Sequence, residues 1–286
     1  MTPKVFSSRR ELKQWTAQCR TNALKIGLVP TMGALHEGHL SLVDAALKKC
    51  DCAIVSIFVN PTQFAPNEDF DKYPRTLESD LARLAHLNSN ANIVVFAPSP
   101  AEMYPEGFDT YVVTGGVALP LEGVARPTHF RGVATVVLKL FLLSSADCAF
   151  FGQKDFQQAR VIEQMVRDLD VPIEIVVCPI VRESSGLALS SRNQYLSPDA
   201  KKNAATLFQS LQGAEREIRA GERSCSAIKQ NIQSIIESVP QQTVEYIKLV
   251  HPETLEEQSE TLTLPVAVLL AVRAGATRLI DNAIFS

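Results

Sequence analysis

The stretch "KIGLVPTMGALHEGHLSLVDAALKKCDCAIVSIFVN", from Lys25 to Asn60, decides the fold of this chain. Residues 25–31 and 52–60 are apolar runs of strand length, and residues 39–50 between them repeat apolar side chains at helical spacing. The second run is almost continuously apolar, which is typical of a strand covered on both faces. A strand, a helix and a strand of these lengths indicate a βαβ unit, and therefore a parallel sheet.

The same alternation continues along the first two thirds of the chain. Helices are expected over 76–88, 132–145 and 156–170, and strands over 92–98, 148–152 and 173–179. This order predicts an α/β fold with a doubly wound, Rossmann-like parallel sheet.

The pattern changes near Ile180, where a polar segment begins. Beyond it the sequence predicts helices at about 198–220 and 224–239, then strands over 244–251, 265–275 and 277–285. We therefore expect a nucleotide-binding domain over 1–184 and a smaller α+β C-terminal domain over 185–286.

Composition narrows the class of protein. Hydrophobic residues make up 46% of the 286 residues, and the net charge of -3 gives no reason to expect a nucleic-acid partner. No apolar run approaches the roughly 20 residues that span a bilayer, and the N-terminus lacks the apolar segment of a secretory signal, so no membrane association is expected. The six cysteines lack zinc spacing, which favours a reduced, cytoplasmic protein.

Two histidines, His36 and His39, lie where the first strand of the opening stretch gives way to its helix. They are open to interpretation as metal ligands, as a catalytic acid and base, as phosphate donors or as structural residues of a turn. Ligands of open α/β sheets bind outside the carboxyl ends of the strands, and the N–H groups and dipole of a helix N-terminus favour phosphate. No third ligand follows at zinc spacing, so the sequence favours phosphate over metal.

Further polar motifs follow other expected elements. In "FGQKD", Lys154 suits a phosphate and Asp155 a ribose or a water-bound Mg²⁺, although the two could instead form a surface pair that caps the next helix. In "NPTQF", the amides Asn60 and Gln63 suit a hydroxy acid, with a plain turn as the alternative. The segment "ALSSRN" is either a phosphate-binding loop or a simple interdomain linker.

Seven ordered blocks resemble one enzyme family. "TMGALHEGH" resembles the H-x-G-H signature of nucleotidyltransferases. The set "PTMGALHEGHLSLV", "SIFVNPTQF", "YPRTLESDL", "RPTHFRGVATVV", "FGQKDFQQ", "ALSSRN" and "RLIDN" closely resembles the pantothenate synthetases (pantoate–β-alanine ligases). The resemblance implies that the pantoate carboxylate attacks the α-phosphorus of ATP, releasing pyrophosphate. The amine of β-alanine then attacks the noncovalent pantoyl adenylate, giving pantothenate and AMP.

The resemblance also implies roles for individual residues. His39 is implied as the acid and His36 as a phosphate donor, with Lys154 as a third catalytic residue. The implied ATP-binding residues are Met32, Gly33, His36, His39, Gly152, Lys154, Asp155, Val181, Leu189, Ser190, Ser191 and Arg192. The implied pantoate-binding residues are Asn60, Gln63, Arg126, His129 and Gln158, although Arg126 could equally be a surface residue. Those implied for β-alanine are Gln63 and Tyr73.

The resemblance further implies Mg²⁺ that accompanies ATP, no metal held by protein ligands and no tightly bound organic cofactor. It implies a homodimer formed through the larger domain, with the C-terminal domain closing as a lid over ATP. Two rival hypotheses remain: a nucleotidyltransferase whose adenylate or nucleotide product never becomes an amide, and a non-catalytic protein that binds adenine nucleotides. The base that deprotonates the β-alanine amine is not identified by the sequence.

Overall fold

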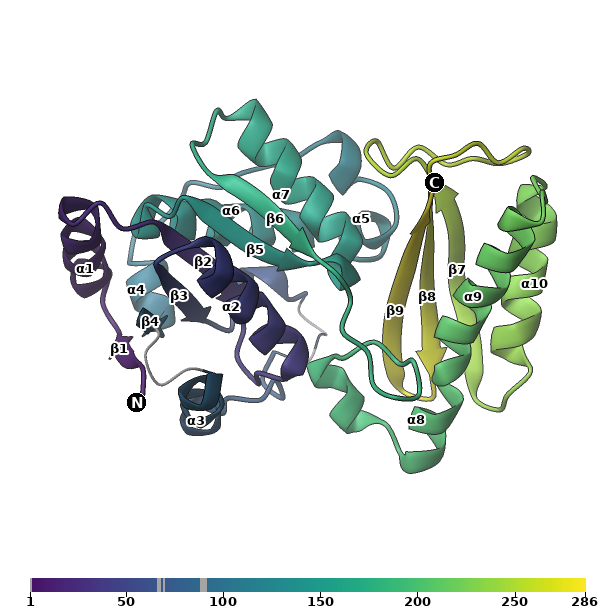
Figure 1. Cartoon of the computed structure of the whole chain (residues 1–286), viewed down its shortest axis with the longest axis horizontal. Helices are drawn as coiled ribbons and strands as arrows, with labels where there is room; N and C mark the ends of the chain where they lie inside the picture. Colours follow the sequence, from purple (N-terminus) through teal and green to yellow (C-terminus); the bar gives the residue numbers. More distant parts are fainter. Residues whose placement is uncertain (1, 66–67, 69, 88–91) are drawn as a thin grey trace. The chain divides into compact units, whose positions relative to one another are not determined.

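The computed structural model describes residues 2–65, 68, 70–87 and 92–286, and it divides into two compact units (Figure 1). The first unit comprises Met1–Gly152 and Gln157–Cys178, and the second comprises Gln153–Phe156 and Pro179–Ser286. The short segment Gln153–Phe156 therefore packs with the second unit, although the chain on either side of it belongs to the first.

The first unit contains a six-stranded sheet, which confirms the predicted doubly wound α/β fold. Every pairing in it is parallel. In spatial order the strands are β1 (Lys4–Phe6), β4 (Asn92–Phe96), β3 (Cys52–Ile57), β2 (Ile26–Thr31), β5 (Cys148–Gly152) and β6 (Glu174–Cys178). The chain runs outward from β2 to β3 and β4 on one side, and from β5 to β6 on the other. The strand order therefore reverses between β2 and β5, which is where open α/β sheets bind ligands.

Helices cover both faces of this sheet. The helices of this unit are α1 (Arg9–Thr21), α2 (Glu37–Lys49), α3 (Leu77–Leu87), α4 (Pro100–Met103), α5 (Glu122–Ala125), α6 (His129–Ser144) and α7 (Phe156–Asp168), with short 3₁₀ turns η1 (Pro61–Gln63) and η2 (Gly116–Ala118). The 3₁₀ turn η3 (Gln153–Asp155) belongs to the second unit. Phe150 belongs to the apolar cluster that includes α2, whereas its neighbour Phe151 contacts Phe141 of α6 with ring centroids 6.5 Å apart. Consecutive strand residues point to opposite faces, so α2 and α6 lie on opposite sides of the sheet.

Most expected elements of this unit are present, with small differences at their ends. The helix expected over 76–88 runs from Leu77 to Leu87, and Asn88 lies outside the described residues. The strand β1 and the helix α1 were not predicted from the sequence, because β1 is only three residues long and α1 buries only Leu12, Thr16 and Cys19. All six cysteines are buried free thiols.

The second unit is the predicted small α+β module. Its antiparallel sheet has the order β7 (Gln242–Val250), β8 (Val266–Ala274) and β9 (Thr277–Phe285). Its helices are α8 (Pro198–Asn203), α9 (Ala205–Arg219) and α10 (Cys225–Glu237), preceded by the 3₁₀ turn η4 (Ser191–Tyr195). The single helix expected over 198–220 is thus divided at Ala204.

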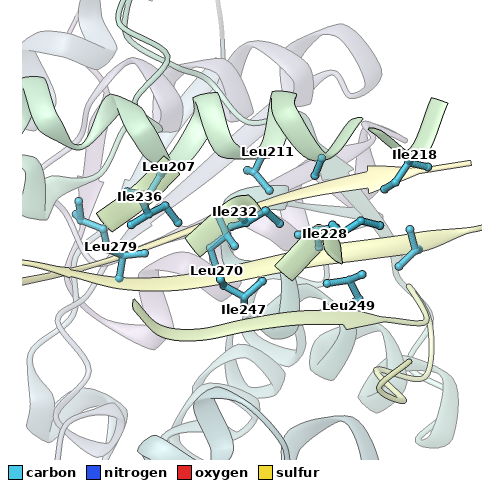
Figure 2. Close-up of a cluster of buried hydrophobic side chains, with 14 of the residues drawn as sticks. Leu207, Leu211, Ile218, Ile228, Ile232, Ile236, Ile247, Leu249, Leu270 and Leu279 are labelled. Atoms are coloured by element: carbon cyan, nitrogen blue, oxygen red, sulfur yellow. The ribbon is translucent and has the colours of Figure 1, made fainter. Parts of the chain in front are cut away.

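The second unit has a hydrophobic core of its own (Figure 2). Leucines and isoleucines of α9 and α10, spaced by about one or two helical turns, point at the inner face of the strands. Those labelled in Figure 2 are Leu207, Leu211, Ile218, Ile228, Ile232 and Ile236, and each is at most 4% exposed. Burying each such side chain contributes about 1.5–3 kcal/mol, so this sheet and its two helices form a stable layer pair.

Candidate active site

Residues 33–39, GALHEGH, connect β2 to α2 through a strained turn and are called the HEGH segment below. Gly33 and Ala34 have φ angles of +84° and +50°, in the left-handed region that glycine adopts easily and alanine does not. The Thr31 hydroxyl accepts a hydrogen bond from the Gly33 N–H at 3.1 Å. Asp80 accepts from the Ala34 N–H at 3.1 Å and from the Leu35 N–H at 2.8 Å. Hydrogen bonds to the side chains of Thr31 and Asp80 therefore hold the backbone of this turn in its conformation.

Asp80 is a residue to which the sequence analysis gave no role. Its carboxylate is 1% exposed, and the Thr76 hydroxyl also donates to it at 3.3 Å. A buried carboxylate is stable only where donors surround it, and two backbone N–H groups and a hydroxyl do so here. The available signal was helical spacing, because Asp80 lies one turn before Leu84 and so on the same buried face of α3.

The two histidines cap the N-terminus of α2 in a reciprocal arrangement. Nδ1 of His36 accepts from the Gly38 N–H at 3.2 Å, and Nδ1 of His39 accepts from the His36 N–H at 3.3 Å. Their rings lie 4.1 Å apart between centroids. A neutral imidazole whose Nδ1 accepts carries its proton on Nε2, so this network assigns a donating Nε2–H to both rings. Protonation at Nδ1 would replace each acceptor with a second donor and break the cap.

This arrangement differs from the simple backbone anion site expected at a helix N-terminus. The N–H groups of His39 and Leu40 donate to the His36 carbonyl oxygen at 2.7 and 3.0 Å. The Gly38 N–H is used by the imidazole of His36. These backbone donors are thus satisfied within the first turn, and the imidazole Nε2–H groups are the donors that the turn supplies in their place.

The two predicted amides lie together after β3. Asn60 is 1% exposed, and its Nδ2 donates to Oε1 of Gln63 at 2.9 Å and to the Gly132 carbonyl oxygen at 3.2 Å. Its Oδ1 accepts from the Tyr104 hydroxyl at 2.8 Å and from the Thr62 hydroxyl at 3.0 Å. Both polar atoms of Asn60 thus have partners inside the protein. Because Oε1 of Gln63 is engaged, the orientation of the Gln63 amide is defined.

Arg126 and His129 also lie against Gln63. The Arg126 guanidinium binds Glu68, with Nε 2.6 Å from Oε1, and donates to the Gln63 carbonyl oxygen at 3.1 Å. Nδ1 of His129 lies 3.0 Å from the same oxygen and must donate, since a carbonyl only accepts. Burial and the charge of Arg126 lower the pKa of His129 to about 4, so its ring is neutral at pH 7. Arg126 and His129 thus both donate hydrogen bonds to the backbone carbonyl oxygen of Gln63.

The remaining predicted residues of the first unit are Met32, Tyr73, Gly152 and Gln158. Met32 and Gln158 are partly buried, and Tyr73 is 5% exposed with its ring edge-on to Phe64, which follows Gln63. Gly152 ends β5, and a Cβ built there would meet no described atom within 4 Å. The carboxyl end of β5 is therefore open on that side.

The second unit carries the other predicted ATP residues. Lys154 lies in η3, with Nζ 3.3 Å from Oδ1 of the half-exposed Asp155. Val181 and Leu189 are joined by a hydrogen bond from the Leu189 N–H to the Val181 carbonyl oxygen at 3.0 Å. The Ser190 hydroxyl caps the turn that contains Ser191 and Arg192 by accepting from the Arg192 N–H at 3.3 Å.

The two sets of residues share one kind of chemistry. The first unit supplies imidazole donors and an oriented amide, and the second supplies an ammonium, hydroxyls and a guanidinium. All of these groups donate hydrogen bonds, and each set taken by itself suits phosphate and carboxylate oxygens. Among the residues that the structure describes, His, Cys, Asp and Glu side chains form no group of three that could hold a metal ion.

The model of the pantoate–beta-alanine ligase family matches residues 4–284. The chain belongs to this family. A pantothenate synthetase of Acetivibrio thermocellus is 52% identical, over 98% of this chain and 99% of its own length. One from Roseiflexus castenholzii is 52% identical over 91% of this chain and 92% of its own.

Solved members of the ligase family have the same fold. The pantothenate synthetase of Thermus thermophilus superposes with a TM-score of 0.89 at 43% identity, covering 98% of both chains. A Francisella tularensis pantoate–beta-alanine ligase, solved with beta-gamma ATP and beta-alanine, gives a TM-score of 0.80 at 34% identity, covering 99% of this chain and 97% of that one. These comparisons confirm the predicted family and the predicted ligase activity at the level of the family.

Proposed function

We propose that the chain condenses pantoate with β-alanine, converting ATP to AMP and pyrophosphate through a noncovalent pantoyl adenylate. The observation that carries this proposal is the HEGH segment, whose imidazoles are fixed as hydrogen-bond donors, in a chain that matches the ligase family over residues 4–284. The carboxyl end of β2 leads into this segment, at the point where the strand order reverses.

Adenylation needs donors placed where negative charge develops on the phosphoryl group. The Nε2–H groups of His36 and His39 serve as such donors, and their capping contacts remove the need to reorganise them during the reaction. Lys154 adds a positive charge. In this mechanism His39 stabilises charge without transferring a proton. Met32, Gly33 and Gly152 line the ATP site in the first unit.

Pantoate binds at Gln63 and Gln158, whose amides contact hydroxyl and carboxylate oxygens without competing as nucleophiles. Asn60, Arg126 and His129 act on pantoate through Gln63, because their polar atoms contact its side chain or its backbone carbonyl. β-Alanine enters beside Gln63 and Tyr73. This arrangement assigns substrate contact to the two glutamines and orientation to the residues around Gln63.

Residues 1–184 then bind ATP and pantoate, and residues 185–286 act as a lid. Asp155 contacts the ribose, and Val181, Leu189 and the segment 190–192 contact the nucleotide and its phosphates through backbone groups, hydroxyls and the Arg192 guanidinium. Closing the lid excludes water, so that the adenylate reacts with the β-alanine amine before it is hydrolysed.

Mg²⁺ accompanies ATP as part of the substrate. Mg²⁺ bound to a nucleotide takes most of its ligands from phosphate oxygens and water, with one or two carboxylates from the protein. The donor set fits this use, since Asp155 offers one half-exposed carboxylate next to Lys154. The Mg²⁺ charge would neutralise the departing pyrophosphate.

The chain is proposed to form a homodimer through its first unit. Large apolar side chains remain exposed there, with Val113 at 76%, Leu119 at 65% and Val124 at 75%. Exposed apolar groups gathered in one segment mark protein interfaces. Sedimentation of wild type as a dimer, and of Val113→Asp as a monomer, would support this interface, and a monomeric wild type would refute it.

A cytoplasmic location is also proposed, because all six cysteines are free thiols. Cell fractionation that recovers the chain outside the cytoplasm would refute it. No helix within the described residues has the length and apolar character needed to cross a membrane.

One assay tests the adenylate: exchange of labelled pyrophosphate into ATP with pantoate present and β-alanine absent. Exchange that depends on pantoate is the expected result, and its absence refutes the adenylate. Adding β-alanine should then release AMP and pantothenate in equal amounts. Exchange without amide formation would instead identify the nucleotidyltransferase rival, and a chain that binds ATP without turnover would be the non-catalytic rival.

A further inference from the structure

The terminal motif "RLIDN" places two buried polar residues side by side on β9. Asp281 is 2% exposed and Asn282 is 3% exposed. Leu279 belongs to the core beneath α9 and α10, so Asp281, two residues later, faces the same side. Asn282 faces the opposite side of the sheet, where its side chain meets η3.

Asn282 binds η3 with both ends of its amide. Its Nδ2 donates to the carbonyl oxygens of Gln153 at 3.0 Å and Lys154 at 3.1 Å. Its Oδ1 accepts from Nε2 of Gln153 at 3.2 Å. These bonds join residues 128 or 129 positions apart in sequence, and they explain why Gln153–Phe156 packs with the second unit.

Asp281 binds a different segment. It accepts two hydrogen bonds from the Arg182 guanidinium, at 2.6 and 2.8 Å, and Arg182 also donates to the Gly186 carbonyl oxygen at 3.0 Å. The guanidinium lies 4.2 Å from the ring centroid of Phe208 on α9. This pairing anchors the loop from Val181 to Leu189, which leads directly into Ser190.

We propose that Asn282 is a positioning residue for Lys154. By binding the carbonyl groups of residues 153 and 154, it fixes the backbone from which the lysine side chain projects. Through the neighbouring Asp281, the same strand anchors the loop that precedes Ser190. A charge stabilises a transition state most when it is already in place, so this anchoring raises the contribution of Lys154. The effect on catalysis rests on the function proposed above, whereas the anchoring does not.

The anchoring can be tested without any enzymatic activity. Backbone amide hydrogen exchange over residues 153–156 is measured in the full chain for wild type, Asn282→Ala and Asn231→Ala. Asn231 is a matched control, because it is a partly buried asparagine of the second unit whose Nδ2 donates to Glu217 on α9. Exchange should accelerate in Asn282→Ala and stay at the wild-type rate in Asn231→Ala. An unchanged rate in Asn282→Ala would overturn the proposal.

The catalytic consequence is tested by a double-mutant cycle on pantoate-dependent pyrophosphate exchange. Losing three hydrogen bonds to η3 should lower the kcat/KM of exchange for ATP about tenfold in Asn282→Ala. In the complete ligase reaction, the KM for β-alanine should stay within about twofold of the wild-type value. In the Lys154→Ala background the same change should have no further effect, because the residue it positions is gone. A further tenfold loss there would mean that Asn282 acts independently of Lys154 and would overturn the proposal.

Gln153→Ala provides a milder variant in case Asn282→Ala does not fold. It removes only the bond to Oδ1 of Asn282, so a loss of about threefold is expected, again absent in the Lys154→Ala background. Additive losses would overturn the proposal. If wild type shows no pantoate-dependent exchange, the proposed function is refuted, and the hydrogen-exchange comparison alone then decides whether Asn282 anchors η3.

Discussion

Two buried aspartates, one in each unit, support the candidate site by different physical means. Asp80 in the first unit accepts hydrogen bonds from backbone N–H groups and a hydroxyl, and it sets the path of the HEGH segment. Asp281 in the second unit makes a bidentate ion pair with Arg182. Removing a partner from a buried ion pair leaves an uncompensated charge, whereas neutral donors can be partly satisfied by another acceptor. The second unit should therefore be the more sensitive to loss of its aspartate.

The largest expected effect is that of Asp281→Asn, which should lower the free energy of unfolding by about 3 kcal/mol because Arg182 is left buried without its counter-ion. Urea denaturation at pH 7 measures it. Arg219→Ala, which breaks an ion pair whose arginine is 78% exposed, is the control and should change stability by less than about 1 kcal/mol. A loss of stability in Asp281→Asn no larger than that in Asp80→Asn would remove the distinction between the two aspartates.

Lowering the pH provides a second test of how the two units differ, because it changes the stability of the first unit through protonation of His129. The folded protein keeps this imidazole neutral down to a pKa of about 4, whereas the unfolded chain binds the proton near the ordinary value of about 6.5. Its contribution to stability is therefore complete above about pH 6.5 and is lost as the pH falls toward 4, by roughly 2 kcal/mol at pH 5. His129→Gln should reduce this loss in denaturation experiments at pH 7 and pH 5. His86→Gln, at an exposed histidine, should leave it unchanged.

The third effect concerns activity. Asp80→Asn retains the shape of the side chain but replaces an acceptor with a donor, which faces the N–H groups of Ala34 and Leu35. We expect pantoate-dependent pyrophosphate exchange to fall about tenfold, or 1.4 kcal/mol, with a smaller loss of stability than in Asp281→Asn. Thr76→Val, which removes only the hydroxyl donor, is the matched control and should retain most activity. Wild-type exchange in Asp80→Asn would show that the HEGH segment does not depend on this carboxylate.

The smallest expected difference, about threefold between two variants of His39, separates two roles for this residue. His39→Ala should lower the exchange rate at least about tenfold. If the residue acts as a neutral donor, His39→Gln, which keeps an N–H group but cannot supply a titrating proton, should recover about threefold of that loss. Equal rates for the two variants would favour literal proton transfer.

Local patterns in the sequence were sufficient for the repeated βαβ units and the C-terminal strands, because long apolar runs and helical spacing reflect burial directly. They did not identify Asp80 or Asn282. The role of each depends on a partner 46 or 129 residues away, and spacing along the chain does not report such contacts. The division of the helix at Ala204 was missed for another reason, since alanine favours helix and the local signal continues across the break.

Sequence also identified which residues bear polar groups near the site but not which of them use those groups within the protein. Asn60 and Gln63 are both amides after β3, and they were predicted alike. The structure distinguishes them, because both polar atoms of Asn60 have internal partners, including Gln63 itself. The orientation of hydrogen-bonding groups depends on tertiary packing and cannot be read from residue type.

The assignment of Gln153–Phe156 to the second unit has a consequence for the modularity of the chain. The polypeptide passes between the units at 152/153, at 156/157 and again at 178/179, so no single cut separates them. A fragment that ends at Cys178 would contain η3 but lack the β9 residue that binds it. Exchange of the second unit between relatives therefore requires that residues 153–156 be transferred together with residues 179–286, as one discontinuous module.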